Sequence, residues 1–561
     1  MIDFSTIKNE LDNFENESID IIDDLKFSQR ENIKKIVYYY NSEFINGKYD
    51  DQGDRKAFFN VSKVSCDVCE KAIDFDVKDI TLRTAQKGAE VKTWFLEKDF
   101  KHWARENQFG KKLNRIFHEL PIYGSVVLKK VKGDYYFVDL KNFAVQQDAD
   151  TLTDASYIIE IHTYNPLQFK RIAKENNWED WEKALEEKTQ ITVYERYGED
   201  DDLNYRRTII AKGESGSEGV VMVDDIVEEH PYWEFHLNKL SGRWQGVGMV
   251  EMSFEPQVRI NQLINQRVKS SYWNALRLWQ CKDPGVKRNL LEDVKNGEIL
   301  QVNDPISQVD MVDRNVVASE NELNRWVNNK NEITFSYDVM RGEALPSRTP
   351  LGTTQLLASQ ATSYFGQIQE NIALDVKEWV FDILEGFRIS NSKEHNLKII
   401  GSDLEEYNLM LINTRVKNEL LKYIFKKLRV PTKEEFGLLK AMVAENIKKG
   451  KEKIETLPSD FFKDLKYEID IMITGESFDS SVDNANRIAL IQLMSSDPAL
   501  FNDPRKRKVL APILERMGIS PVELDGGEQQ NLQEMVQRGG GGVSKPVMPA
   551  YPTPGETRTN L

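Results

Sequence analysis

A long apolar periodicity in the middle of the chain constrains the fold more than any other feature. From about residue 353 to Arg388, apolar side chains recur every three or four residues and share one side of a helix. These side chains are Leu357, Ala361, Phe365, Ile368, Ile372, Val376, Trp379 and Ile383. Unbroken, the helix would be about 50 Å long, more than a small globular core can cover. We therefore expect it to cross domains or to pack against other subunits, with a kink at Gly366.

The first of two shorter helices upstream is expected from Phe254 to about residue 276. Its apolar seam consists of Ile260, Leu263, Ile264, Val268 and Leu276. Beside the seam, Gln257, Asn261 and Asn265 recur at i, i+4 and i+8 and form a stripe of uncharged amides. The helix therefore presents an apolar seam for a neighbour and a polar stripe next to it.

The second helix is expected over residues 319–333, because Ser319 and Glu322 have the spacing of a capping box. The segment from Gly342 to Gly352 then ends it, since two prolines and flanking glycines cannot stay in a helix. The middle of the chain is thus predicted to run helix, short insert, helix, Pro-rich loop and long helix.

This order of elements resembles the central module of the portal proteins of tailed bacteriophages. The resemblance is carried by residues 242–251 (GRWQGVGMVE), by the amide stripe, and by the stretch from Gly342 to Leu357. In that family two stem helices flank a small clip domain, and a tunnel loop follows the second stem helix. A long kinked helix then leads back under a mixed α/β wing. The resemblance extends over residues 28–535.

The resemblance implies an α+β, predominantly helical fold with a wing, a two-helix stem, a small α/β clip, a long kinked helix and a helical crown. The implied segments, in chain order, are the N-terminal part of the wing (28–245), stem helix 1 (246–279), the clip (280–317), stem helix 2 (318–341), the tunnel loop (342–353), the long kinked helix (354–390), the C-terminal part of the wing (391–480) and the crown (481–537). The two ends depart from the family: the acidic residues 1–27 are expected to form a short helix or an N-terminal arm, and the Gly/Pro-rich residues 538–561 a disordered tail.

The implied wing carries local signals of its own. Ser28 and Glu31 repeat the capping-box spacing and start an amphipathic helix that Asn46-Gly47 ends. Strands are expected at residues 124–130, 135–138, 157–163, 191–197, 208–211, 397–400 and 467–473, and the last two could rejoin the wing sheet. Further helices are expected at residues 166–171, 408–427 and 432–449 and within 482–537.

By resemblance, about twelve copies would form a ring at one capsid vertex around a channel for genome packaging and ejection. The implied partners are the chain itself, the terminase large subunit, neck or adaptor proteins, the major capsid and scaffolding proteins, and double-stranded DNA. The tunnel-loop residues Ser347, Arg348 and Thr349 would meet phosphates without reading bases. Lys282, Lys287 and Arg288 in the clip would contribute to docking of partners. No catalysis and no cofactor are implied, because ATP hydrolysis belongs to the terminase.

Composition is compatible with this interpretation and limits others. The net charge of −16 argues against a protein that grips nucleic acid over its whole surface. No apolar run approaches 18 residues, and the acidic start of the chain has no signal-peptide core. We therefore expect a protein without a membrane segment that is made in a cytoplasm. The resemblance implies that this is the host cytoplasm and that the protein becomes part of the virion.

Motifs of other functional classes are weak or missing in the chain. The one CxxC motif, Cys66 to Cys69, has no second pair of zinc ligands at a suitable spacing, which favours buried or reducible thiols. The carboxylates Asp148, Asp150 and Asp154 are typical of a solvated loop rather than a metal site. The chain has no phosphate-binding loop, no HExxH and no GxSxG motif. A different neck or connector protein, or a metal-dependent nuclease with scattered carboxylates, remains the alternative.

Overall fold

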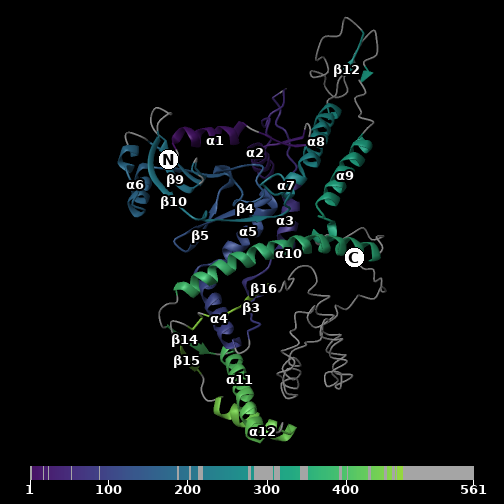
Figure 1. Ribbon diagram of the computed structural model, residues 1–561. Coiled ribbons are helices and arrows are strands. Elements are labelled where there is room, and N and C mark those ends of the chain that lie inside the picture. Colours follow the sequence, from purple (N-terminus) through teal and green to yellow (C-terminus); the bar gives the residue numbers. More distant parts are fainter. Residues whose placement is uncertain are drawn as a thin grey trace, which may run out of the picture. The chain divides into compact units, whose positions relative to one another are not determined.

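The computed structural model describes residues 3–471 with internal gaps, and its elements are labelled in Figure 1. The gaps are residues 17, 23–24, 52, 87–88, 186–188, 201, 203, 213–218, 276–278, 283–306, 309–315, 342–350, 391–394, 401, 428–430, 448–451, 458–460 and 463. The described part is a mixed α+β fold in which every strand pair is antiparallel.

A five-stranded sheet has helices on both of its faces. Its strand order is β10-β9-β8-β7-β6, with β6 (Phe143–Val145), β7 (Tyr157–Tyr164), β8 (Ile191–Glu199), β9 (Tyr205–Lys212) and β10 (Gly219–Ile226). On one face, α1 (Phe4–Asn16) packs Phe4, Ile7 and Phe14 against Ala144, Ile159 and Ile210. On the other, α6 (Pro166–Glu175) and η3 (Trp181–Leu185) cover Ile191, Val193 and Ile209. Alternate residues of β9 thus serve opposite faces.

The N-terminal segment is therefore part of the core rather than a free arm. Its helix α1 adds to the sheet packing a buried ion pair in which Arg196 Nη2 lies 2.7 Å from Glu10 Oε1. The hairpin of β1 (Ile19–Ile22) and β2 (Leu25–Phe27) follows α1 and leads to Ser28. Of the short helix or arm expected for residues 1–27, the structure has the helix, with three buried apolar side chains on one face.

A second, three-stranded sheet has the order β11-β4-β5, with β4 (Ser125–Val131), β5 (Asp134–Val138) and β11 (Tyr232–His236). The predicted hairpin is confirmed. Lys132 and Gly133 at its tip both have positive φ, +53° and +90°, as a two-residue turn of this kind requires.

The largest core lies where helices from the first third of the chain meet α10 (Leu351–Ser390). Those helices are α2 (Gln29–Tyr40), α3 (Ser62–Ile73), α4 (Glu90–Glu106) and α5 (Phe109–Tyr123), and the short α7 (Met249–Met252) from the middle of the chain joins them. The predicted apolar stripe of α10 is confirmed, since all of its members from Ala361 to Ile383 are buried. At about 1.5 Å per residue, α10 is about 60 Å long. It stays helical through Gly366, where the kink was predicted.

The remaining elements complete the central module and its surroundings. They are α8 (Phe254–Ala275), β12 (Trp279–Gln280), β13 (Ser307–Gln308), α9 (Val316–Ile333), η5 (Asp338–Arg341), η1 (Val77–Asp79), η2 (Leu140–Asn142), β3 (Ile80–Arg83), β14 (His395–Ile400), α11 (Ser402–Lys427), α12 (Lys433–Ile447), β15 (Glu452–Leu457) and β16 (Glu468–Ile471). None of the described helices is long and apolar enough to cross a membrane.

Several boundaries and pairings differ from the sequence predictions. The helix that Ser28 caps ends at Tyr40, before Asn46-Gly47. Ser319 lies inside α9, which begins at Val316, so the capping box predicted there is wrong. Strand β16 does pair with a strand of the first part of the chain, β3, whereas β14 pairs with β15. The predicted crown and tail, the tunnel loop up to residue 350 and most of the clip lie outside the described residues.

Candidate functional site

The predicted amide stripe of α8 lies along residues 57–62, an irregular segment that ends in the first residue of α3, and hydrogen-bonds to its backbone. Asn265 exchanges two bonds with Ala57: its Nδ2 donates to the carbonyl at 2.9 Å, and its Oδ1 accepts from the N–H at 2.8 Å. One turn of helix earlier, Asn261 Oδ1 accepts from the N–H of Phe59 at 2.9 Å. The stripe therefore bonds to backbone N–H and carbonyl groups of this segment, which in a sheet would be paired with a neighbouring strand.

Gln257 completes this pairing and is itself fully buried. Its Nε2 donates to Phe59 O at 2.6 Å, and its Oε1 accepts from the N–H groups of Val61 at 3.0 Å and Ser62 at 3.2 Å. A side-chain amide suits this role because it carries both a donor and an acceptor. The three side chains that pair in this way, which we call the amide ladder, are Gln257, Asn261 and Asn265.

The amide ladder works because a helix and a strand have commensurate repeats. Four residues of helix rise about 6 Å, and two residues of strand advance about 6.6 Å. Steps of four along α8 therefore match steps of two along the segment, so that residues 265, 261 and 257 face Ala57, Phe59 and Val61 in turn. The i, i+4, i+8 spacing in the sequence thus matches the backbone of a segment that runs antiparallel to α8 and leads into α3.

Helices α8 and α9, which pack against each other, both form hydrogen bonds with residues at the start of α3. Gln257 of α8 accepts a hydrogen bond from the hydroxyl of Ser62 at 3.0 Å. Lys330, in the last turn of α9, donates to Ser65 Oγ at 3.1 Å, and the hydroxyl of Thr334 lies 3.1 Å from the same oxygen. Burial, with a further effect from Arg341, lowers the pKa of Lys330 to about 8. The start of α8 and the end of α9 are therefore held by neighbouring serines, Ser62 and Ser65, in the first turn of α3.

Helices α8 and α9 are antiparallel neighbours with a short paired insert between them (Figure 1). Near the end of α8 and the start of α9, Arg267 Nη2 lies 2.7 Å from Glu320 Oε1. The predicted apolar seam is covered at one end only. Ile260 is buried, but Val268 is 53% exposed in the single chain. The distal part of the pair thus leaves apolar surface open.

The segment 242–251, which leads into α8, is held by its own buried polar groups. The guanidinium of Arg243 pairs with Glu251, with Nη1 and Oε1 2.8 Å apart, and Nε donates to Gln245 O at 2.7 Å. Trp244 Nε1 donates to Glu234 Oε2 at 2.7 Å. The aromatic ring of Phe27 lies 3.9 Å from the guanidinium of Arg243. These contacts give Arg243 and Trp244 a structural role, and we call residues 242–251 the joint.

A serine–histidine–glutamate chain lies beside this joint. Ser125 Oγ is 2.8 Å from His236 Nδ1, and His236 Nε2 is 3.1 Å from Glu234 Oε2. Ser125 is fully buried, and its oxygen accepts a hydrogen bond from the N–H of Gly246 at 2.8 Å. A nucleophile needs access to its substrate, which this serine does not have. The chain therefore ties β4, β11 and the joint together.

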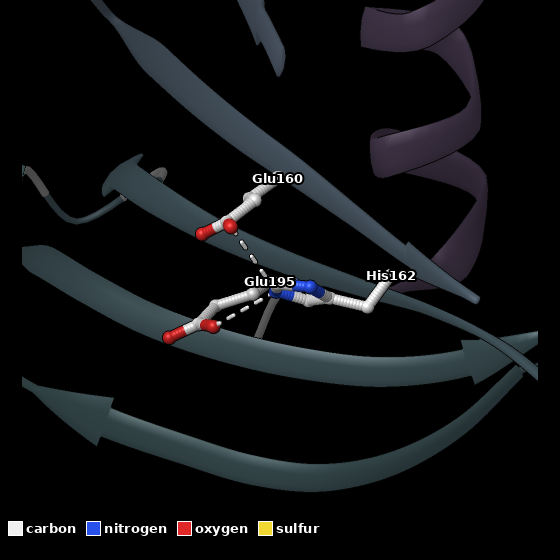
Figure 2. A group of neighbouring side chains, drawn as sticks. All are labelled: Glu160, His162 and Glu195. Atoms are coloured by element: carbon white, nitrogen blue, oxygen red, sulfur yellow. Dashed lines mark ion pairs between the residues drawn. The ribbon is translucent and has the colours of Figure 1, made fainter. Parts of the chain in front are cut away.

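A charge cluster occupies the face of β7 and β8 that meets β4. Figure 2 shows Glu160, His162 and Glu195 pointing toward one another from adjacent strands. His162 Nε2 lies 3.6 Å from Glu160 Oε1 and 3.5 Å from Glu195 Oε2. The ammonium of Lys129 on β4 lies 2.7 Å from Glu160 Oε2 and 2.5 Å from Glu195 Oε2.

The environment fixes the charge states in this cluster. Burial alone would raise the pKa of Glu195, but Lys129, His162 and Arg207 outweigh it and hold that pKa far below its usual range. Burial, then the nearby glutamates, raises the pKa of Tyr232 well above its ordinary value. Glu195 is thus ionised at neutral pH, next to a neutral tyrosine hydroxyl.

Of the other predicted site residues, Lys282 is exposed just after β12. The remaining ones, in the clip and the tunnel loop, lie outside the described residues: Lys287, Arg288, Ser347, Arg348 and Thr349. The structure therefore brings the amide ladder together with a partner segment and, of the other two predicted sites, describes only Lys282.

The thiols and the acidic loop are placed as the sequence predicted. Cys66 and Cys69 are buried in α3, and burial raises the pKa of both. Asp148, Asp150 and Asp154 are exposed. Among the described residues, the only group of three side chains with metal-ligand spacing is the cluster around His162.

Sequence reasoning missed both that cluster and the partner of the amide ladder. The signal for the cluster was present, because Glu160 and His162 alternate within a predicted strand and so share a face. The opposing Glu195 could not be assigned without the register of β7 and β8. Residues 57–62 gave no signal, since nothing local marks a segment that pairs with a helix.

No protein-family model matches the chain, and no curated protein matches it.

Proposed function

We propose that the chain is the subunit of a tailed-phage portal, a ring at one capsid vertex through which DNA is packaged and ejected. The observation that carries the proposal is the order of the central elements. An antiparallel pair, α8 and α9, flanks an insert that β12 and β13 close, and the 40-residue α10 follows after residues 342–350. This is the order of stem, clip, stem, tunnel loop and long helix in the family that the sequence resembles.

The uncovered surface of the helix pair supports assembly. On α8, Val268 and Tyr272, four residues apart and so on one side of the helix, are 53% and 63% exposed in the single chain. Contiguous exposed apolar surface is costly in water and marks contacts with other chains. In a ring, this surface of each copy would contact a different surface of the next copy. The repeated contact would cover the exposed apolar side chains of α8.

In this role the protein acts mechanically and has no catalysis of its own. The net charge of −16 permits a channel wall with little attraction for DNA, past which DNA could slide. Ser347, Arg348 and Thr349 would be the few groups that touch phosphates. The clip would present Lys282, Lys287 and Arg288 to the terminase large subunit and later to neck or adaptor proteins. The outer parts would contact capsid and scaffolding proteins in the virion.

The mass of the full-length protein in solution tests the proposal. We expect light scattering to give a species of about twelve subunits, and negative-stain class averages to show rings with a central hole. Tyr272→Asp should shift this species toward smaller assemblies, because it places a charge on the exposed surface of α8. Leu167→Asp on α6, whose side chain is 83% exposed, is the matched control and should leave the mass unchanged.

A protein that remains a monomer or dimer from low to high salt, without rings in any image, would overturn the proposal. Rings without a hole would favour a different connector of the phage neck. Equal effects of the two aspartate variants would show that the α8 surface is not where the copies meet.

A further inference from the structure

Two glutamates face each other on a buried part of the five-stranded sheet. In the register of β7 and β8, Glu160 is directly opposite Glu195. Like charges in this position repel, so the sheet must supply a cation between them. His162 is two residues along β7 on the same face and brings a nitrogen to the same place.

The spacing of the three ligand atoms is that of a metal site. The Nε2 atom of His162 and one oxygen of each glutamate lie within 4.8 Å of one another. The distances of 3.6 and 3.5 Å from Nε2 to the two oxygens exceed an ordinary hydrogen bond of about 2.9 Å. Tetrahedral ligands about 2.1 Å from a zinc ion would be separated by about 3.4 Å.

We propose that Glu160, His162 and Glu195 bind a divalent transition-metal ion of the zinc class. One imidazole and two carboxylates form a donor set that zinc accepts, with water completing the coordination. The side chain of His162 is 24% exposed, which gives the ion a path from solvent. The site is independent of the proposed portal function.

Neighbouring side chains donate hydrogen bonds to the two glutamates, as the groups that surround the ligands of a metal site do. The hydroxyl of Tyr232 donates to Glu160 Oε2 at 3.0 Å, which leaves Oε1 free to face His162. On the other strand, Tyr197 donates to Glu195 Oε1 at 2.9 Å, and Arg207 Nε donates to the same oxygen at 3.0 Å. Such bonds fix the orientation of ligating carboxylates.

Lys129 is the competitor of the metal ion. Its ammonium supplies the positive charge between the glutamates in the metal-free protein, at 2.7 and 2.5 Å from their oxygens. A divalent ion would take over this charge, and repulsion would turn Lys129 away from Glu195. This competition separates the proposal from a purely structural ion cluster, because it predicts that loss of Lys129 strengthens metal binding.

Zinc binding to the chelator-treated full-length protein tests the inference. Isothermal titration calorimetry with Zn²⁺ should give one ion per chain, and Co²⁺ should give the visible absorption bands of a site of low coordination number. His162→Ala should weaken zinc binding about tenfold or more, since it removes a direct ligand. Lys129→Gln should bind zinc more tightly than the natural chain. Zinc should raise the melting temperature of the natural protein and leave that of His162→Ala unchanged.

The control is His102→Ala on α4, a surface histidine whose Nδ1 lies 3.6 Å from a single carboxylate, Glu106. It should bind zinc as the natural chain does. Equal zinc affinity of the natural chain and His162→Ala would mean adventitious binding only and would overturn the proposal. Weaker binding by Lys129→Gln would also overturn it, because the lysine would then support the site rather than compete with the ion. If Lys129→Gln fails to fold, the comparison of His162→Ala with His102→Ala decides the test.

Discussion

Three glycines beside the α8 joint bring two backbone segments closer than any side chain would allow. A Cβ atom on Gly246 would lie 2.5 Å from the carbonyl oxygen of Gly124, and one on Gly248 would lie 2.8 Å from the nitrogen of Gly124. Gly124 also has a φ of +76°, a conformation that favours glycine. The contact fixes the end of α5 against residues 246–248, which lead into α7 and α8.

Gly246→Ala should destabilise the protein by about 2–3 kcal/mol, because its methyl group would meet backbone that cannot move aside. Chemical denaturation of the purified variant measures this change. Gly366→Ala on α10 is the control, since nothing lies within 4 Å of the position that its methyl group would take and alanine favours a helix. It should stabilise the protein by about 0.5–1 kcal/mol. Equal effects of the two substitutions would contradict the close contact.

A single carboxylate on α10 makes stability depend on pH near neutrality. Burial, together with Glu378 and Glu234, raises the pKa of Asp375 from 3.8 to about 7, although the N–H of His236 bonds to it. The folded state therefore holds a proton that the unfolded state releases at lower pH. The contribution of this group to stability is complete below about pH 4 and is lost as the pH rises to about 7.

Asp375→Asn should remove this loss, because the amide stays neutral and still accepts a hydrogen bond. Relative to the natural chain, the variant should gain stability as pH rises, reaching about 1–2 kcal/mol at pH 8 after allowance for solvent screening. Thermal melts from pH 5 to pH 8 measure the difference. The exposed Glu370→Gln on the same helix should follow the natural chain at every pH. A gain that is constant across this range would show that charge at Asp375 is not its cause.

At the scale of elements, the amide ladder replaces a missing strand partner for residues 57–62. Gln257→Leu keeps the volume of the side chain but leaves buried N–H and carbonyl groups of this segment unpaired. We expect a cost of about 2–4 kcal/mol and faster hydrogen exchange in residues 57–62. Gln266→Leu, on an exposed side of α8, is the control and should change neither measurement. Slow exchange of the segment in Gln257→Leu would mean that other contacts hold it.

Turns and helix starts that depend on a few neighbouring residues could be predicted from the sequence. The segments with which an element pairs or packs could not. The turn at Lys132-Gly133 and the helix start at Ser28 appear as expected because short-range geometry determines both. Strand β10 was missed, and so was the pairing of β14 with β15, because each depends on a partner outside its own segment. The amide stripe shows the same limit. Its spacing was evident, but the backbone it binds lies about 200 residues earlier.

At the scale of the whole described molecule, α10 makes one core out of distant parts of the chain. Its buried residues pack with α3, α4 and α5 from the first third and with Phe462, Leu465 and Ile471 from the end of the described chain. No sequence pattern predicts this association, since the apolar stripe of α10 specifies only that it must be covered. Because the segments share a core, we expect residues 3–471 to unfold together rather than helix by helix.

Trp379 is the side chain that tests this cooperativity. It is fully buried, and its ring lies 4.7 Å from Phe109 of α5, 5.4 Å from Tyr135 of β5 and 5.7 Å from Phe235 of β11. Trp379→Ala would leave a cavity between three elements and should cost about 3–5 kcal/mol. In urea, far-ultraviolet circular dichroism and tyrosine fluorescence should then shift together to a lower midpoint, because the elements share one transition. Leu374→Ala, at a position 54% exposed on the same helix, should shift neither probe by more than about 0.5 kcal/mol. Two separate transitions in Trp379→Ala, with the five-stranded sheet melting at its original midpoint, would instead mean that the sheet folds independently of α10.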